Sequence, residues 1–132
     1  MIGYTMVGTS DLERSLQFYD PIFAEMNLDQ CWRDEMSAAW GDKADDTVPR
    51  FFTGYPFNDQ QATVGNGVMT AFLVKDAASI DRLYEIAMRG GGADEGPPGF
   101  RPQYGEGFYG AYVRDPDGNK IAFVCYRAGQ PL

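Results

Sequence analysis

Histidine is absent from the 132 residues of the sequence. The chain therefore lacks the side chain that most often acts as a general base near neutral pH and as a ligand of transition metals. Cysteine is scarce, and Cys31 and Cys125 lie far apart in apolar, strand-like stretches. We expect both thiols to be buried and reduced, which favours a cytoplasmic protein over a disulfide-stabilised secreted one.

Positive charge is also scarce, because 11 basic residues face 19 acidic ones and the formal charge is −8. Such a surface repels phosphate backbones and anionic lipids, so neither nucleic acid nor a membrane is an expected partner. No run of 18 consecutive apolar residues is present, and the first residues carry no basic region typical of a secretion signal. These absences predict a cytoplasmic globular domain.

The first half of the chain begins with an apolar strand over residues 2–8. A helix should follow, since apolar residues recur at spacings of three and four from Leu12 onward. Ser10 and Glu13 have the spacing of a capping box at its start. Pro21 falls inside the pattern and should kink or end the helix, because proline has no backbone N–H to donate.

The second half repeats this order at an offset of 65 residues. An apolar strand over 68–74 precedes Asp76, which can cap a second amphipathic helix, and the glycines at 90–92 should stop that helix. The offset places Met69 at the position that Tyr4 holds in the first half.

Three short strands are expected after each helix. They cover residues 29–34, 37–40 and 50–55 in the first half, and 93–95, 108–114 and 120–126 in the second. The turn at 115–119 should join the last two strands as a hairpin. This order predicts an α+β fold in which two βαβββ modules form a curled mixed sheet around a cleft, with the helices outside. The single domain would span 1–132, with modules at about 1–56 and 67–127 and a connector at about 57–66.

Three stretches carry a resemblance to a known family. They are VGTSDLERSLQFY at 7–19, GVMTAFLV at 67–74 and YGAYVRDPDGNKI at 109–121. Together they resemble the vicinal oxygen chelate superfamily of glyoxalases, bleomycin resistance proteins and extradiol dioxygenases, over nearly the whole chain. The third stretch is the most specific, because Asp-Pro-Asp-Gly-Asn before a final apolar strand is characteristic of the family when it follows a match in the first module.

In metal-using members of this family, four positions inside the cleft bind a divalent cation. The resemblance places them at Tyr4, Met69, Ala122 and either Phe51 or Phe52. None of these side chains offers an imidazole or a carboxylate. The resemblance therefore implies a metal-free branch without a cofactor, in which the floor of the cleft is apolar and aromatic.

The segment 96–110 is rich in glycine and proline and carries four aromatic residues. We expect a mobile loop that closes over the cleft as a lid, although an ordinary surface loop remains the alternative. Trp40 could stack on a planar ligand, or it could cover a hairpin or a subunit contact. Tyr109 and Tyr112 should point to opposite faces of one strand, so they cannot both line the cleft.

Three functions remain open. The leading hypothesis is a homodimeric binding protein, similar to the bleomycin-resistance branch, that holds a small aromatic or carbonyl-containing molecule without a metal. The alternative is a metal-independent isomerase or lyase acting on a small carbonyl compound, with Tyr4 or Tyr104 as acid and Glu106 or Glu35 as base. A glyoxalase-type metalloenzyme is disfavoured by the residues at the ligand positions. The predicted ligand-binding residues are Tyr4, Trp40, Phe52, Met69, Arg101, Gln103, Tyr104, Tyr109 and Ala122.

Overall fold

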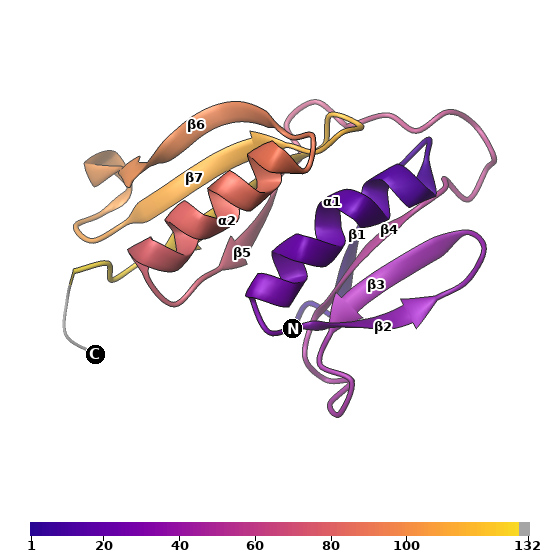
Figure 1. The fold of residues 1–132 in the computed structure, drawn as a ribbon, viewed down its shortest axis with the longest axis horizontal. Coiled ribbons are helices and arrows are strands. Elements are labelled where there is room, and N and C mark those ends of the chain that lie inside the picture. Colours follow the sequence, from indigo (N-terminus) through magenta and orange to yellow (C-terminus); the bar gives the residue numbers. More distant parts are fainter. Residues whose placement is uncertain (130–132) are drawn as a thin grey trace.

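The computed structural model describes residues 1–129, which form two βαβββ modules side by side (Figure 1). The elements of module one are β1 (Tyr4–Gly8), α1 (Leu12–Glu25), β2 (Asp29–Arg33), β3 (Ser37–Gly41) and β4 (Arg50–Gly54). Those of module two are β5 (Thr70–Leu73), α2 (Ala77–Arg89), β6 (Ala93–Phe100), β7 (Tyr109–Arg114) and β8 (Lys120–Cys125), with a 3-10 helix, Pro102–Tyr104, after β6. The predicted α+β class and element order are confirmed; the last three residues of the predicted domain lie outside the described part.

Each module has its own four-stranded mixed sheet. Sheet A has the order β1-β4-β3-β2 and sheet B the order β5-β8-β7-β6. β1 runs parallel to β4 and β5 parallel to β8, while the other neighbouring strands are antiparallel. The single curled sheet expected from the sequence is therefore two separate sheets, which do not close into a barrel.

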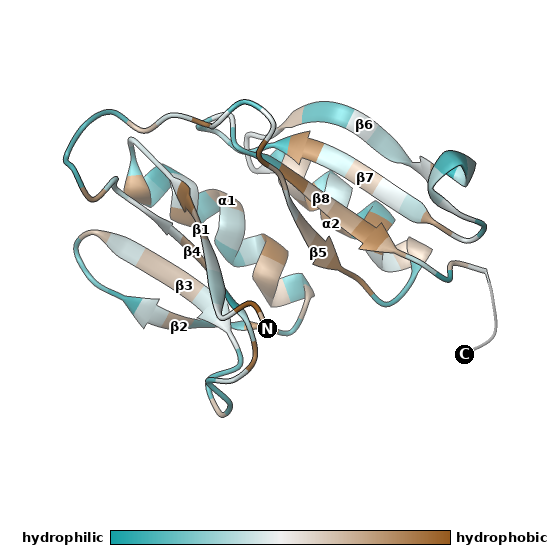
Figure 2. Cartoon of the chain, turned by 180° about the vertical axis from the view of Figure 1, so that it is seen from behind, coloured by the Kyte–Doolittle hydropathy of each residue, from teal (hydrophilic) through white to brown (hydrophobic). Residues whose placement is uncertain are grey.

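Both helices cover the same side of the two sheets, as Figures 1 and 2 show from opposite directions. The helices also contact each other, and they contact strands of their own modules. The other side of each sheet, called here its open face, has no helix over it. Within residues 1–129, no helix is long and apolar enough to cross a membrane.

Aromatic rings fill the space between the helices and the sheets. Phe23 of α1 stacks on Trp40 of β3, with 5.1 Å between ring centroids. Phe51 of β4 meets Phe72 of β5 edge to face at 5.0 Å, and Phe23 also meets Phe72 at 5.3 Å. Edge-to-face and offset contacts at these distances are favourable between aromatic rings. One core therefore spans both modules.

The helix termini agree only partly with the sequence prediction. Asp11, not Ser10, caps α1, because its carboxylate accepts a hydrogen bond from the Arg14 backbone N–H. Pro21 lies inside α1 and does not end it. The prediction for α2 is confirmed, since Asp76 accepts from the Ser79 N–H at its start and Gly90 follows its last residue.

A network of polar side chains joins the two modules; we call it the latch. The Tyr19 hydroxyl donates to Asp115 Oδ2 at 2.7 Å, and the Thr9 hydroxyl donates to Asp117 Oδ2 at 2.6 Å. Asn119 Nδ2 donates to Asp115 and to the carbonyl of Gly8. The hairpin turn at 115–119 therefore bonds both to itself and to module one, at Gly8, Thr9 and Tyr19, and its turn sequence alone does not reveal this role.

Burial raises the pKa of both members of the central latch bond. Desolvation is the main cause that raises the pKa of the Asp115 carboxyl above its ordinary value, although bonds from Asn119 and Tyr19 partly offset it. Desolvation and the neighbouring Asp115 charge together raise the pKa of the Tyr19 phenol well above its ordinary range. The phenol thus stays protonated and keeps donating to the carboxylate.

Candidate functional site

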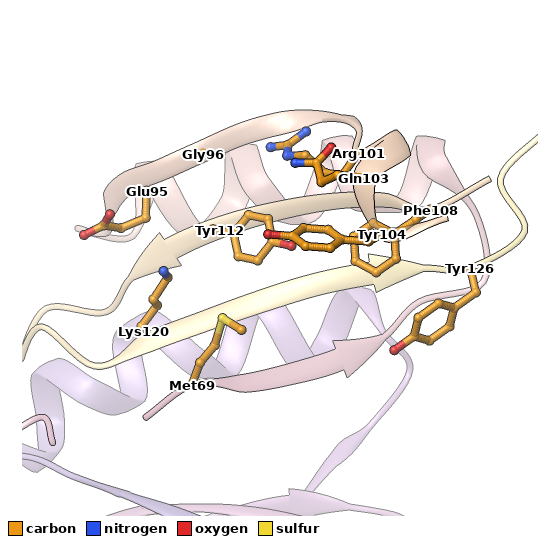
Figure 3. A pocket seen from close by; sticks show the side chains of 10 residues that line it. All are labelled: Met69, Glu95, Gly96, Arg101, Gln103, Tyr104, Phe108, Tyr112, Lys120 and Tyr126. Carbon is orange, nitrogen blue, oxygen red and sulfur yellow. The ribbon is translucent and has the colours of Figure 1, made fainter. Parts of the chain in front are cut away.

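A pocket of about 630 Å³ opens on the open face of sheet B (Figure 3). Its walls come from β6, the 3-10 segment, β7, β8 and the residue before β5. The lining residues are Met69, Glu95, Gly96, Arg101, Gln103, Tyr104, Phe108, Tyr112, Lys120 and Tyr126. We call this the sheet B pocket.

Strand alternation explains which side chains reach this pocket. On β7, Ala111 and Val113 are fully buried in the core, so Tyr112 between them points to the open face. On β8, Ile121 is fully buried on the helix side, and Lys120 points to the pocket. The parallel register pairs Thr70 with Ile121, which places Met69 beside Lys120 at the same edge.

Aromatic rings form one wall of the pocket. Tyr104 meets Phe108 edge to face at 5.4 Å, and Phe108 meets Tyr126 in the same way at 5.5 Å. Figure 3 shows Tyr112 extending this group of rings toward Lys120. A series of ring faces of this kind suits a planar or aromatic ligand.

Two basic side chains lie against the Tyr112 ring. Arg101 Cζ is 5.6 Å from the ring centroid and Lys120 Nζ is 5.7 Å from it. Burial and the neighbouring Tyr104 raise the pKa of the Tyr112 phenol, and the charge of Arg101 partly offsets this effect. Tyr112 is therefore a neutral hydrogen-bonding group at neutral pH.

Four of the predicted ligand-binding residues line the sheet B pocket. They are Met69, Arg101, Gln103 and Tyr104. Ala122 lies directly beneath the floor; it has no exposed surface and packs with Phe108, Val124 and Tyr112. Met69 and Ala122, which the resemblance assigned to the cleft, thus lie on the same face of sheet B.

Tyr4 and Phe52 lie together on the other open face, that of sheet A. Their ring centroids are 5.2 Å apart, and Tyr4 is 67% exposed. The register left open between Phe51 and Phe52 is now fixed, because Phe51 is only 4% exposed and belongs to the core. The structure does not bring Tyr4 or Phe52 into the sheet B pocket.

The structure places Trp40, predicted to stack on a ligand, in the core and outside the sheet B pocket. Trp40 is only 2% exposed, its ring stacks on Phe23, and its Nε1 donates to Asp20 Oδ1 at 2.8 Å. A short strand end suggested an exposed ring, but α1 covers that side of β3. Trp40 is a core residue.

Tyr109 points away from the pocket, as expected if Tyr112 points into it. Its hydroxyl donates to Asp81 Oδ1 on α2 at 2.6 Å. This bond, together with burial, raises the pKa of Tyr109 to about 12. The structure therefore places Tyr109, predicted to bind the ligand, outside the sheet B pocket, and Tyr112 lines the pocket instead.

The candidate acids and bases are not brought together. Glu106 is exposed and lines a separate groove with Phe100 and Gly107, whereas Tyr104 lines the sheet B pocket. Glu35 is exposed between β2 and β3 in module one. Neither carboxylate forms an acid–base pair with Tyr4 or Tyr104 in the described hydrogen bonds of residues 1–129.

The predicted lid is partly a strand. Residues up to Phe100 belong to β6 and pair with β7, with register shifts between Asp94 and Gly96 and between Gly96 and Gly99. These irregularities accommodate glycine and proline within a sheet edge. The remaining part, which includes the 3-10 helix, forms one end of the pocket.

Several pocket residues were missing from the predicted set. They are Glu95, Gly96, Phe108, Tyr112, Lys120 and Tyr126. Lys120 could have been predicted from the sequence, because it lies two positions before Ala122 and therefore on the same face of the strand. The same alternation would have placed Tyr112 in the pocket, because Tyr109 and Tyr112 point to opposite faces and Tyr109 faces the helix.

The positions that the resemblance equates with metal ligands do not fit a divalent cation. Phenol, phenyl, thioether and methyl groups occupy them at Tyr4, Phe52, Met69 and Ala122. In the described part of the chain, no three His, Cys, Asp or Glu side chains gather as a metal site would require. Both cysteines are free thiols; Cys125 is buried and Cys31 half-buried.

Comparisons with known proteins agree with this geometry. A sequence model of the Glyoxalase/Bleomycin resistance protein/Dioxygenase superfamily matches residues 1–123. The chain is 33% identical to a glyoxalase/bleomycin resistance protein from Albidiferax ferrireducens T118, with a TM-score of 0.82 over 95% of this chain and 98% of that one. A search among curated proteins gives no significant match.

Two more distant structures share the fold. A glyoxalase-related enzyme from Fulvimarina pelagi is 21% identical, with a TM-score of 0.71 over 95% of this chain and 87% of that one. A lactoylglutathione lyase from Agrobacterium tumefaciens is 18% identical, with a TM-score of 0.65 over 95% and 92% of the two chains. The match of the family model over most of the chain, together with its paired βαβββ modules, shows that this protein belongs to the glyoxalase/bleomycin resistance protein/dioxygenase superfamily.

Proposed function

We propose that this protein binds a small aromatic or carbonyl-containing molecule in the sheet B pocket and does so without a metal. The observation that carries the proposal is the wall of rings formed by Tyr104, Phe108 and Tyr126, which continues to Tyr112. Ring faces and apolar side chains hold such a molecule by contact area, and a few polar groups orient it. The residues at the family's ligand positions support a mode of binding that needs no cation.

Binding without turnover is favoured over isomerase or lyase chemistry. General acid–base catalysis needs a proton donor or acceptor within hydrogen-bond reach of each substrate atom that gains or loses a proton. In residues 1–129, the tyrosines that donate to carboxylates are Tyr19, Tyr84 and Tyr109, and all three lie outside the pocket. The carboxylate in the pocket, Glu95, is instead paired with Arg114 at 2.8 Å.

A thermal-stabilisation screen with small aromatic and dicarbonyl compounds tests the proposal. A ligand that binds the folded state raises the unfolding midpoint with its concentration. We expect stabilisation by aromatic members of the set, unchanged by added divalent metal and without product in the mixture. The variant Phe108→Ala should reduce the effect, whereas Phe57→Ala, in the exposed connector, should not. A requirement for metal, or the appearance of product, would contradict the proposal.

The proposal includes a homodimer. β1 and β5 are edge strands of their sheets, so each has one edge without a hydrogen-bonded neighbouring strand within the described part of the chain. Exposed apolar side chains lie along them, with Tyr4 67% and Leu73 68% exposed. A two-fold axis would let the β1 edge of one copy meet the β5 edge of the other and cover these side chains. The cytoplasmic setting expected from the sequence stays a prediction.

Light scattering after size exclusion tests the dimer. The wild-type chain should have twice the mass of the monomer, and the double variant Tyr4→Lys/Leu73→Lys should shift toward the monomer because the charges would be buried without partners. Phe57→Lys is the matched control, since this ring is fully exposed in the connector. A monomeric wild type at high concentration would disprove this part of the proposal.

A further inference from the structure

The charge around the sheet B pocket is opposite in sign to the net charge of the whole chain. The chain has a formal charge of −8 and only 11 basic residues, yet two of them, Arg101 and Lys120, line this pocket. The acidic residue of the lining, Glu95, is paired with Arg114. The pocket is therefore a local region of positive charge on an acidic protein.

Neither Arg101 nor Lys120 belongs to a salt bridge in the described part of the chain. The four ion pairs there join Arg14 with Asp117, Arg33 with Glu13, Arg82 with Glu25, and Arg114 with Glu95. Both pocket cations are half-buried, and both lie against the face of a tyrosine ring. Their charges are thus available to a ligand without the cost of breaking an existing pair.

The glycine-rich end of β6 makes room for the guanidinium. A Cβ atom on Gly99 would lie 3.0 Å from Arg101 Nη1, and one on Gly96 would lie 3.4 Å from Nη2. Arg101 Nη2 also donates to the carbonyl of Pro97 at 2.6 Å. The strand therefore packs closely around the guanidinium and holds it against the Tyr112 ring. Larger residues in place of Gly96 and Gly99 would crowd the guanidinium.

We infer that the ligand is a small aromatic carboxylate, whose anionic group lies between Arg101 and Lys120 and whose ring lies against Tyr104 and Phe108. Figure 3 shows the two cations on different sides of Tyr112, with the rings beyond it. A guanidinium can donate two parallel hydrogen bonds to a carboxylate, and an ammonium adds a point charge. This inference rests on the proposed function, because it specifies the ligand class of the same pocket.

A pair of matched compounds tests the charge preference. Naphthalene-2-carboxylate and naphthalene-2-carboxamide have the same ring and nearly the same shape, but only the first is an anion. We expect the carboxylate to bind the wild-type protein at least about tenfold more tightly by calorimetry, as a charge-assisted bond would provide. This preference should weaken as salt is raised.

Variants assign the preference to the two cations. Arg101→Gln and Lys120→Gln should each reduce carboxylate affinity by about tenfold and leave carboxamide affinity nearly unchanged. Lys43→Gln and Arg89→Gln are controls that make the same charge change at exposed positions outside the pocket. Unfolding midpoints of all variants would verify that they fold.

The outcomes separate this inference from the proposed function. Equal binding of the two compounds to the wild type would overturn the anionic ligand while leaving an aromatic-binding pocket in place. A carboxylate preference that persists in the double variant Arg101→Gln/Lys120→Gln would also overturn it. Failure of both compounds to bind, with failure of the wider screen, would reject the proposed function and this inference with it.

Discussion

Modules one and two have the same strand and helix order, but their open faces differ in chemistry. Arg50 of β4 and Lys120 of β8 occupy equivalent positions in the two sheets. Each directly precedes a residue that pairs with the first strand of its module, Phe51 with Thr5 and Ile121 with Thr70. Arg50 lies over Gly41, and its buried Nε has no hydrogen-bond partner in the described structure. Lys120 instead lines a pocket with aromatic walls.

The helix-facing sides differ in a complementary way. Module one contributes large rings to the core, with Tyr19, Phe23 and Trp40 in mutual contact. Module two contributes mainly aliphatic residues such as Ile80 and Leu83. The comparison indicates that module one contributes more aromatic packing to the core, while module two carries the pocket proposed as the binding site.

Removal of a module one ring should cost the most stability. Phe23→Ala deletes a side chain that is 2% exposed and contacts four other rings, so we expect a loss of about 3–5 kcal/mol in the free energy of unfolding. Phe100→Ala in module two removes an exposed ring and should cost about 1 kcal/mol or less. Denaturant titration measures both losses. Similar losses would contradict the expectation that the rings of module one contribute more to stability.

Loss of one latch hydroxyl should weaken the connection between the modules. Tyr19→Phe leaves the largely buried Asp115 without one of its donors, and we expect it to cost about 1–3 kcal/mol. Tyr84→Phe also removes a tyrosine–carboxylate bond, to Asp94, but at an exposed site where the cost should be about 0.5 kcal/mol or less. Equal costs in chemical unfolding would show that the latch contributes no more than a surface contact.

Alkaline pH should weaken module two through Tyr109. Its pKa in the folded state is about 12, above the ordinary 10.0, so the folded state retains the proton more strongly than the unfolded state does. The stabilisation is complete below the ordinary value and is lost as pH rises toward the folded value. The stability difference between wild type and Tyr109→Phe should therefore shrink between about pH 10 and about pH 12 in urea titrations. A constant difference would contradict the assignment.

Removal of a pocket cation should have the smallest effect on stability. Lys120 has no ion pair in residues 1–129, so Lys120→Gln should change the free energy of unfolding by no more than about 0.5 kcal/mol. Thermal unfolding without ligand is the measurement. A large loss would mean that this side of module two is structural, and the division between packing and binding would fail.

The fold could be predicted from the sequence because its signals are local. Helical spacing from Leu12, the cap at Asp76 and strand alternation all depend on neighbours in the chain. Where the prediction failed, a distant residue was responsible. Ser10 has the right spacing for a cap, but its N–H and hydroxyl donate to Asp117, and Asp11 caps the helix instead.

The site was harder to predict for the same reason. Trp40 is covered by α1, and Tyr109 is drawn to the helix side by Asp81, contacts that no local pattern encodes. The glycine and proline content of residues 96–100 suggested a loop, whereas strand bulges allow the segment to pair. Family resemblance assigned Met69 and Ala122 to one cleft, and both lie on the pocket side of sheet B because their strands are parallel neighbours in register.

The latch also sets an order for synthesis. Thr9 and Asp117 are separated by 108 positions, and Arg14 reaches the same carboxylate across 103. A ribosome releases the N-terminal residues first, so the beginning of α1 must wait for nearly the whole polypeptide before its polar partners emerge. The nascent N-terminal half therefore leaves the exit tunnel without these hydrogen bonds, which form only after the final hairpin has been synthesised.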